Sequence, residues 1–464
     1  MSVNKGAESV KSRIRWDKLI GDRNELCVVL IVLFAMFFAG CASQSEIGTE
    51  ATASDDAVEV EDTEITTTTE AIAQSTEAEA GDDAADGEET DVATDVEPNF
   101  ELTGELELTT AEINDMVAFV ETSAGREFLR PPIIQVVSVE EFEAGLVPDP
   151  EFEAELAEFN ETAARFQQAL GHTSQGVEEY NAALDDIGTS TELISGRYDP
   201  FDDVVIIPEG VLEGDDFNAI LVHELLHALD GQYVDLASLI EQMQSLATEE
   251  SASDTAFQIA AVVEGRASVT QFEWMEANGV VPTAQDIPEA FDTVPGNVIN
   301  QVALPYQLGA QTIFQLGGVE ATWDLYDNFP TSSEQMIFSA RIGADEPITV
   351  EAPAVDGEVF YEGVFGAEGM ILLGLGDNLE PNQLEVITAL SAAEGWGGDY
   401  FVLSGDEAQS CFTGAIVADS EEDLTELSDL FADWAARETV HGAERTADLE
   451  GDTVTIRSCA PFVS

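Results

Sequence analysis

The sequence predicts an α+β fold that is rich in helix and has a mainly antiparallel sheet. Several long segments place apolar residues three and four positions apart, which is typical of amphipathic helices. Other segments are short runs of β-branched and aromatic residues, which are typical of strands. The two kinds are mixed along the chain and no internal repeat is visible, so the pattern favours an α+β arrangement.

Proline, glycine and capping residues set the boundaries of the predicted elements. Pro131 and Pro132 stop any helix before the first strand, and Pro208 ends a later strand. Gly231 suits the end of a helix, and residues 331–334 have the pattern of a capping box. In order, we expect a helix at 110–122, a strand at 133–139, a largely helical stretch at 140–180, a turn at 197–200, a strand at 204–207, helices at about 215–229 and 255–275, a strand at 401–403, strand-like segments around Cys411 and Cys459, and a helix at about 421–437.

The composition is strongly acidic, with a formal net charge of −79. All three lysines lie in the first 18 residues, and past Gly40 the lysine and arginine side chains are nine arginines. Such a surface repels nucleic acid and anionic lipid, so we expect no nucleic-acid partner. Solvation in a salty environment explains the charge best, and bulk cation binding is the alternative.

The first 40 residues have the pattern of a secretion signal, because basic residues precede an apolar run at 27–38. The next residues, Phe38-Ala39-Gly40-Cys41, resemble a bacterial lipobox, in which a signal peptidase cuts before a cysteine that receives diacylglycerol. This resemblance implies a signal peptide at 1–40 and a chain that is lipid-anchored through Cys41 on the extracytoplasmic face of the cell membrane. The alternative is an uncleaved single-pass anchor, although the apolar run is shorter than the ~20 residues that a span needs.

Residues 41–97 are rich in Thr, Glu, Asp, Ala and Gly and contain almost no large apolar residue. Such a segment cannot bury enough surface to order itself, so we expect a disordered acidic stalk. The folded region is then 98–464, either as one domain or with a C-terminal α+β subdomain from about residue 350.

Two cysteines remain if Cys41 is lipidated and Cys27 is removed with the signal peptide. Cys411 and Cys459 form an even pair in an oxidising compartment, and both lie in strand-like segments. We therefore expect a Cys411–Cys459 disulfide, with two free thiols or a metal pair as the alternatives.

The strongest chemical signal is His223-Glu224-x-x-His227. On a helix, positions i and i+4 lie on one face, so the two imidazoles can share one tetrahedral metal ion. Glu224 can reach a metal-bound water, which is where a general base is needed. The chain has only four histidines, which makes chance a poor explanation. The alternative is two core histidines that have ordinary hydrogen-bond partners.

A catalytic zinc needs a third protein ligand and one open position. No third histidine follows closely, which argues against the classes that have one. Glu264 is the best candidate, because it is a lone carboxylate in the apolar stretch 260–267 and such a charge is costly unless it is paired or metal-bound. The alternative is a salt bridge to Arg266 or Arg341.

His223-Glu224-x-x-His227 followed by a glutamate on a later helix resembles the gluzincin peptidases, of which thermolysin is a member. The stretch from about residue 198 to Glu264 also resembles actinobacterial and haloarchaeal lipid-anchored proteins of that clan. The resemblance implies a zincin-like fold, zinc held by His223, His227 and Glu264, and Glu224 as the general base. Gluzincins often carry an aspartate four residues after the third ligand to orient the first histidine, and Ser268 stands there instead. Asp230 and Asp254 are the alternatives for that role.

The resemblance also places a substrate beside the strand that precedes the active-site helix. Residues 203–207 fit an open edge that pairs with the substrate backbone, and an ordinary paired strand is the alternative. Peptide hydrolysis also needs an oxyanion donor besides zinc. Tyr306 is the preferred candidate, and the others are Tyr198, Arg341, His172 and His441.

The sequence therefore predicts a zinc metallopeptidase that acts on a peptide or protein substrate at the cell surface. One alternative is an inactive surface lipoprotein with a structural zinc site, and the other is a solute-binding lipoprotein. The motif favours the enzyme, while the substrate and the oligomeric state stay open.

Overall fold

The computed structural model describes residues 97–464 except 107, 147–149, 189–195, 211–213, 247–251, 281–293 and 377–382. The expected signal peptide, Cys41 and all but the last residue of the expected stalk lie outside the described residues. Residues from Pro98 to Ser464 belong to one compact unit. No helix in the described ranges is long and apolar enough to cross a membrane.

The first sheet, sheet A, has four strands in the order β1-β2-β4-β3. The strands are β1 (Glu101–Thr103), β2 (Ile133–Val137), β3 (Arg197–Asp199) and β4 (Val204–Pro208). β2 is parallel to both β1 and β4, whereas β3 is antiparallel to β4. The expectation of mainly antiparallel strands therefore fails in this sheet, and the predicted turn at 197–200 is in part an edge strand. The predicted open edge at 203–207 was also wrong, because β4 pairs on both sides.

The second sheet, sheet B, is fully antiparallel and has the order β5-β6-β7-β9-β8. Its strands are β5 (Glu358–Gly363), β6 (Trp396–Gly405), β7 (Gln409–Ala418), β8 (Glu444–Glu450) and β9 (Thr453–Pro461). Cys411 and Cys459 face each other across β7 and β9 and form the expected disulfide. The bridge joins residues 48 positions apart, so it constrains the unfolded chain over the whole C-terminal segment.

Helices make up much of the remaining described chain, as the sequence predicted. α2 begins after Thr109, whose side chain accepts from the Glu112 N–H while the Glu112 carboxylate accepts from the Thr109 N–H, and it ends at Gly125 in the left-handed region. The helices are α2 (Thr110–Ala124), α3 (Val139–Ala144), α4 (Pro150–Leu170), α5 (Val177–Gly188), α6 (Gly214–Gly231), α7 (Leu236–Leu246), α8 (Ala252–Asn278), α9 (Gly296–Gln315), α10 (Ser333–Ile337), α11 (Gly366–Leu375), α12 (Gln383–Glu394) and α13 (Glu421–Ala436), with short 3-10 helices η3 (Glu320–Tyr326), η4 (Ser339–Arg341) and η5 (Val440–Gly442).

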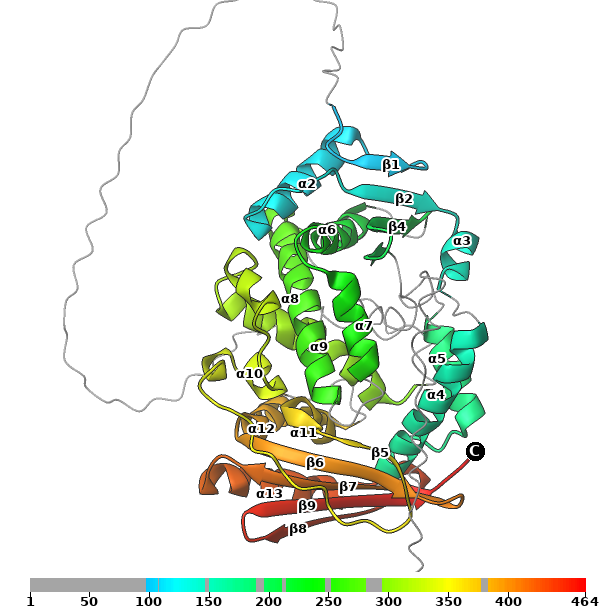
Figure 1. Cartoon of the computed structure of the whole chain (residues 1–464), viewed down its shortest axis with the longest axis vertical. Helices are drawn as coiled ribbons and strands as arrows, with labels where there is room; N and C mark the ends of the chain where they lie inside the picture. Colours follow the sequence, from blue (N-terminus) through cyan, green and yellow to red (C-terminus); the bar gives the residue numbers. More distant parts are fainter. Residues whose placement is uncertain are drawn as a thin grey trace, which may run out of the picture. The chain divides into compact units, whose positions relative to one another are not determined.

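The largest of three apolar core clusters in the described residues joins both sheets and the helices between them. It contains Val205 and Ile207 of sheet A, Leu225 of α6, and Phe401 and Phe412 of sheet B. Figure 1 shows α8 and α9 running from the level of sheet A toward sheet B, and α4 packs against β7 and β9. The α6 and α8 helices pack against each other, and this contact positions the candidate site.

Candidate metal centre

The α6 helix carries the His223-Glu224-x-x-His227 motif. The apolar side chains around the motif, for example those of Leu221, Leu225 and Leu226, are inaccessible to solvent. Burial of this face against sheet A and α8 therefore fixes the helix, and the two histidines lie on one side of it. Their Nε2 atoms are 3.1 Å apart, so both rings point at the same place.

Glu264 reaches this place from α8. Its Oε2 atom lies 3.2 Å from His223 Nε2 and 3.4 Å from His227 Nε2, and all three side chains are buried. The alternative pairing of Glu264 with an arginine does not occur. Arg266 bonds to Asp230 instead, and Arg341 lies with other carboxylates.

The geometry of the three donor atoms fits a zinc ion. Two zinc ligands at about 2.0–2.1 Å from a tetrahedral ion are separated by about 3.3–3.4 Å. The observed separations of 3.1, 3.2 and 3.4 Å lie close to that value. Two imidazoles and one carboxylate are also the donor set that zinc accepts, so His223, His227 and Glu264 form a group able to hold a metal.

Charge coupling within the group is strong. Burial by itself lowers the pKa of His227, but the carboxylates of Glu264 and Glu224 outweigh burial and raise it to about 9. Burial raises the pKa of Glu264, but His227 and His223 outweigh burial and lower it to about 2. The Glu264 side chain is thus held as a carboxylate, which is the form that ligates a metal.

Glu224 lies beside the three donors and is also buried. Burial raises the pKa of its carboxyl group, and the neighbouring histidines oppose that shift. The carboxylate accepts a hydrogen bond from the backbone N–H of Tyr198 on β3. Edge strand β3 therefore helps to hold Glu224 in place. The sequence analysis predicted a turn at this position and gave it no such role.

Tyr306 of α9 completes the group. Its hydroxyl is hydrogen-bonded to Glu264, and its ring stacks on His223 with centroids 6.2 Å apart. Burial, together with Glu264 and Glu224, raises the pKa of Tyr306 well above its ordinary value. The hydroxyl thus stays protonated and can donate a hydrogen bond near the three donor atoms.

Two glycines allow α8 and α9 to approach closely enough for this contact. A Cβ on Gly265 would lie 2.4 Å from the carbonyl carbon of Gly309, and a Cβ on Gly309 would lie 2.2 Å from the Ala261 carbonyl oxygen. Gly265 follows Glu264, and Gly309 is one helical turn beyond Tyr306. The glycine after the third donor therefore has a packing role between the two helices.

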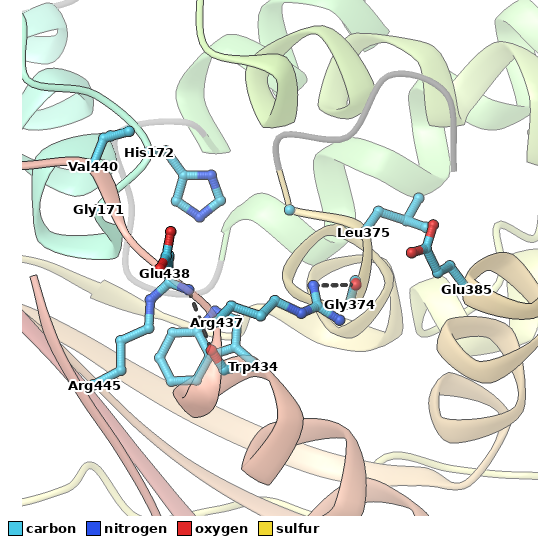
Figure 2. Close-up of a pocket in the computed structure, with 11 residues that line it drawn as sticks. Gly171, His172, Gly374, Leu375, Glu385, Trp434, Arg437, Glu438, Val440 and Arg445 are labelled. Atoms are coloured by element: carbon cyan, nitrogen blue, oxygen red, sulfur yellow. Dashed lines mark hydrogen bonds between the residues drawn. The ribbon is translucent and has the colours of Figure 1, made fainter. Parts of the chain in front are cut away.

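The other oxyanion candidates from the sequence lie elsewhere or point elsewhere. The Tyr198 hydroxyl donates to Asp203, and His441 Nε2 contacts the Pro461 carbonyl oxygen. His172 lines a separate cavity of about 310 Å³ between the ends of α4, α11 and α13, together with Arg437 and Arg445 (Figure 2). Arg437 donates to a carbonyl at the end of α11, and Arg445 donates to carbonyls at the ends of α4 and α13, so both arginines cap helix C-termini.

Arg341 lies in a second acidic group with Glu334, Asp345 and Asp419. Its Nη1 atom is bonded to Asp345, lies 2.7 Å from Asp419 and 3.6 Å from Glu334. The Arg341 guanidinium lies among the three carboxylates and pairs with them, so this group is a partly exposed ion-pair network. Burial raises the pKa of Glu334 to about 8 despite Arg341.

Neither aspartate suggested for orienting a histidine is bonded in that way in the structure. Asp254 accepts from the Ser333 N–H and from Gln258. Asp230 accepts from Arg266 and Tyr326. The sequence analysis named Arg266 only as an alternative partner of Glu264, and it missed the pairing with Asp230 and the bond from Tyr326. An arginine in an apolar helix is itself a signal that a buried carboxylate lies nearby.

The chain was compared with protein-family models, with curated proteins and with solved structures, and no match was found in any of the three.

Proposed function

We propose that this protein is a zinc-dependent metallopeptidase of the gluzincin type with a zincin-like fold. The observation that carries the proposal is the convergence of His223, His227 and Glu264 within 3.1–3.4 Å of one another, with Glu224 beside them. The two histidines have metal-ligand spacing on one helix, and Glu264 adds a carboxylate from a second helix. Because a buried acid, Glu224, lies beside them, the arrangement fits hydrolysis better than a purely structural site.

Each protein group has a defined part in this proposal. Zinc, when bound by the three ligands, polarises the scissile carbonyl and makes a water molecule more acidic. Glu224 takes the proton from that water and gives it to the leaving amine, while the Tyr198 N–H holds its carboxylate. Tyr306 supplies a neutral O–H that can donate to the developing oxyanion or keep Glu264 oriented.

The proposed location is the extracytoplasmic face of the cell membrane. The lipobox-like Phe38-Ala39-Gly40-Cys41 and the acidic segment that follows support a lipid anchor and a stalk. Replacing Cys41 with serine should move the protein from the membrane fraction to the soluble fraction. Retention of the variant in the membrane would support the uncleaved anchor instead.

A structural zinc site in a surface lipoprotein is the second candidate. The burial of Glu224, with 7% of its surface exposed, favours this reading because a catalytic water needs access. In that case the protein would hold zinc and hydrolyse nothing.

The deciding experiment measures zinc content and casein hydrolysis for the purified protein and for Glu224→Gln. We expect about one zinc per chain in both, because Glu224 is not a ligand, and a loss of about 10²–10⁴-fold in rate in the variant. Zinc without activity in the wild type would support the structural site. Absence of zinc from both proteins would refute the ligand assignment and would leave the solute-binding alternative.

A further inference from the structure

Three buried side chains join the two helices that carry the metal donors. The Arg266 guanidinium on α8 donates from Nε to Asp230 Oδ2 at 2.9 Å and from Nη2 to Asp230 Oδ1 at 3.0 Å. The Tyr326 hydroxyl of η3 donates to the same Asp230 Oδ2 at 2.6 Å. We name Asp230, Arg266 and Tyr326 the helix clamp.

The Arg266 guanidinium makes further contacts besides those to Asp230. Its Nη1 donates to the Val319 carbonyl at 2.7 Å and to the Thr322 hydroxyl at 2.9 Å. Its guanidinium also lies 4.2 Å from the centre of the Trp323 ring. The side chains of Arg266 and Asp230 are both 0% exposed, so water cannot replace any of these bonds. A bidentate pair in this setting has one geometry, because the flat guanidinium fork must match the carboxylate.

The clamp lies next to the metal donors along both helices. Asp230 follows His227 by three residues on α6 and therefore projects from the same side of that helix. Arg266 follows Glu264 by two residues on α8. At 1.5 Å of rise per residue, the ion pair lies within about 5 Å of both donors along the helix axes. The ion pair thus joins α6 and α8 close to the height of the donors, within the wider packing of the two helices.

We infer that Asp230, Arg266 and Tyr326 are positioning residues of the metal centre, which hold the His227 helix against the Glu264 helix. The inference rests on the proposed zinc site. His223 and His227 come from one helix and Glu264 from the other, so their 3.2 and 3.4 Å separations depend on how the two helices lie. A four-coordinate zinc tolerates only small errors in these separations, so loosening the clamp weakens zinc binding before it unfolds the protein.

The test compares zinc affinity with stability in three variants of the full chain. Tyr326→Phe removes only the 2.6 Å bond to Asp230 and keeps the ring, while Arg266→Lys keeps the charge but cannot make the bidentate pair. Ser458→Ala is the matched control, because Ser458 is fully buried in sheet B and donates to the Ala169 carbonyl at 2.6 Å. Zinc dissociation constants come from competition with a chromophoric chelator, and thermal midpoints come from the metal-free proteins.

We expect the zinc dissociation constant to rise about 10-fold in Tyr326→Phe and up to about 100-fold in Arg266→Lys. In Ser458→Ala it should stay within about twofold, although the thermal midpoint falls. Lower midpoints with unchanged zinc affinity in both clamp variants would overturn the inference and leave the clamp a structural contact. If Arg266→Lys does not fold, Tyr326→Phe decides.

The outcome also separates this inference from the proposed function. A wild-type protein that binds no zinc would refute both. A wild-type protein that binds zinc without hydrolysing casein would refute the peptidase alone, and the affinity comparison would still decide the role of the clamp.

Discussion

Tyr306 is the side chain whose role in the proposed metal centre has two alternatives. Its hydroxyl bonds to Glu264 and its ring lies against His223, so it contacts two of the three donors. Two roles are compatible with this position: a donor to the oxyanion or a support for the Glu264 carboxylate. The first affects the rate of the reaction, whereas the second affects the affinity for zinc.

Tyr306→Phe should therefore lower kcat about 10–10³-fold with little change in KM or in zinc content if Tyr306 serves the oxyanion. Steady-state kinetics on a peptide substrate and metal analysis measure these quantities. Tyr180→Phe is a suitable control, because Tyr180 is a buried tyrosine that lies on α5, away from the metal donors. Loss of zinc from Tyr306→Phe would assign it to the support of Glu264 instead.

Asp399 is a buried carboxyl group outside the proposed metal centre, and its titration should affect how the stability depends on pH. It accepts from the N–H groups of Phe365 and Gly366 and from Trp396 Nε1. Burial raises its pKa to about 7 in spite of these three donors. The folded protein then binds a proton more tightly than the unfolded chain does, so stability falls as pH rises from about 4 to 7.

Asp399→Asn should flatten this dependence, because an amide does not titrate. The free energy of unfolding of the wild type should lose on the order of 2–4 kcal/mol from this group over that interval, and the variant should not. Urea unfolding at pH 5 and pH 8 measures the difference. Asp406→Asn is the control, since Asp406 also accepts backbone N–H bonds but is exposed. Parallel pH profiles for wild type and Asp399→Asn would contradict the prediction.

Among the elements, the contact of α8 with α9 does most to assemble the centre. Sheet A and α6 place the two histidines, but Glu264 and Tyr306 meet only because α8 and α9 touch at Gly265 and Gly309. Backbone atoms approach there without intervening side chains, so no larger residue fits unless the helices separate.

Gly309→Ala should therefore reduce both stability and zinc affinity. The added Cβ would lie 2.2 Å from the Ala261 carbonyl oxygen, and relieving that overlap costs about 1–3 kcal/mol in unfolding free energy. Gly414→Ala in sheet B is a milder change that leaves α8 and α9 alone, because its Cβ would lie 3.1 Å from the Ile456 side chain. Thermal unfolding with and without zinc compares the two. Equal zinc affinity in both variants would show that this contact does not place Glu264.

For the whole molecule, charge dominates solution behaviour. The net charge is −79, so the carboxylates of the folded protein repel one another. Salt screens this repulsion beyond a Debye length, which is about 10 Å at 0.1 M and about 3 Å at 1 M. Of the nine arginines past Gly40, Arg165, Arg197 and Arg266 are buried, and Arg266 and Arg341 are paired with carboxylates.

The urea midpoint should accordingly rise with KCl between about 0.05 and 1 M, and most of the gain should come before 1 M. Equilibrium unfolding followed by fluorescence measures the midpoint. KCl is preferable to a sulfate salt, because sulfate also strengthens burial of apolar groups. A midpoint that does not depend on KCl would show that the acidic surface carries no net electrostatic penalty.

Local patterns in the sequence predicted many of the helices, the disulfide and the candidate metal ligands. The spacing of His223 and His227 placed both imidazoles on one helix face, and Glu264 stood out as a lone charge in an apolar stretch. The structure brings these three side chains together. Helices with strong apolar periodicity and the Cys411–Cys459 bridge were also predictable, because their signals depend on residues close in sequence or on a simple count.

Only the tertiary structure decided which elements surround that motif. The parallel pairing of β4 with β2 and the bond from Tyr198 to Glu224 depend on partners far along the chain. The edge strand β3 pairs locally with β4, but a three-residue strand has too weak a local preference to reveal itself. The same holds for the helix clamp of Asp230, Arg266 and Tyr326. Sequence spacing fixes what one helix presents, whereas the packing of two helices decides what those side chains meet.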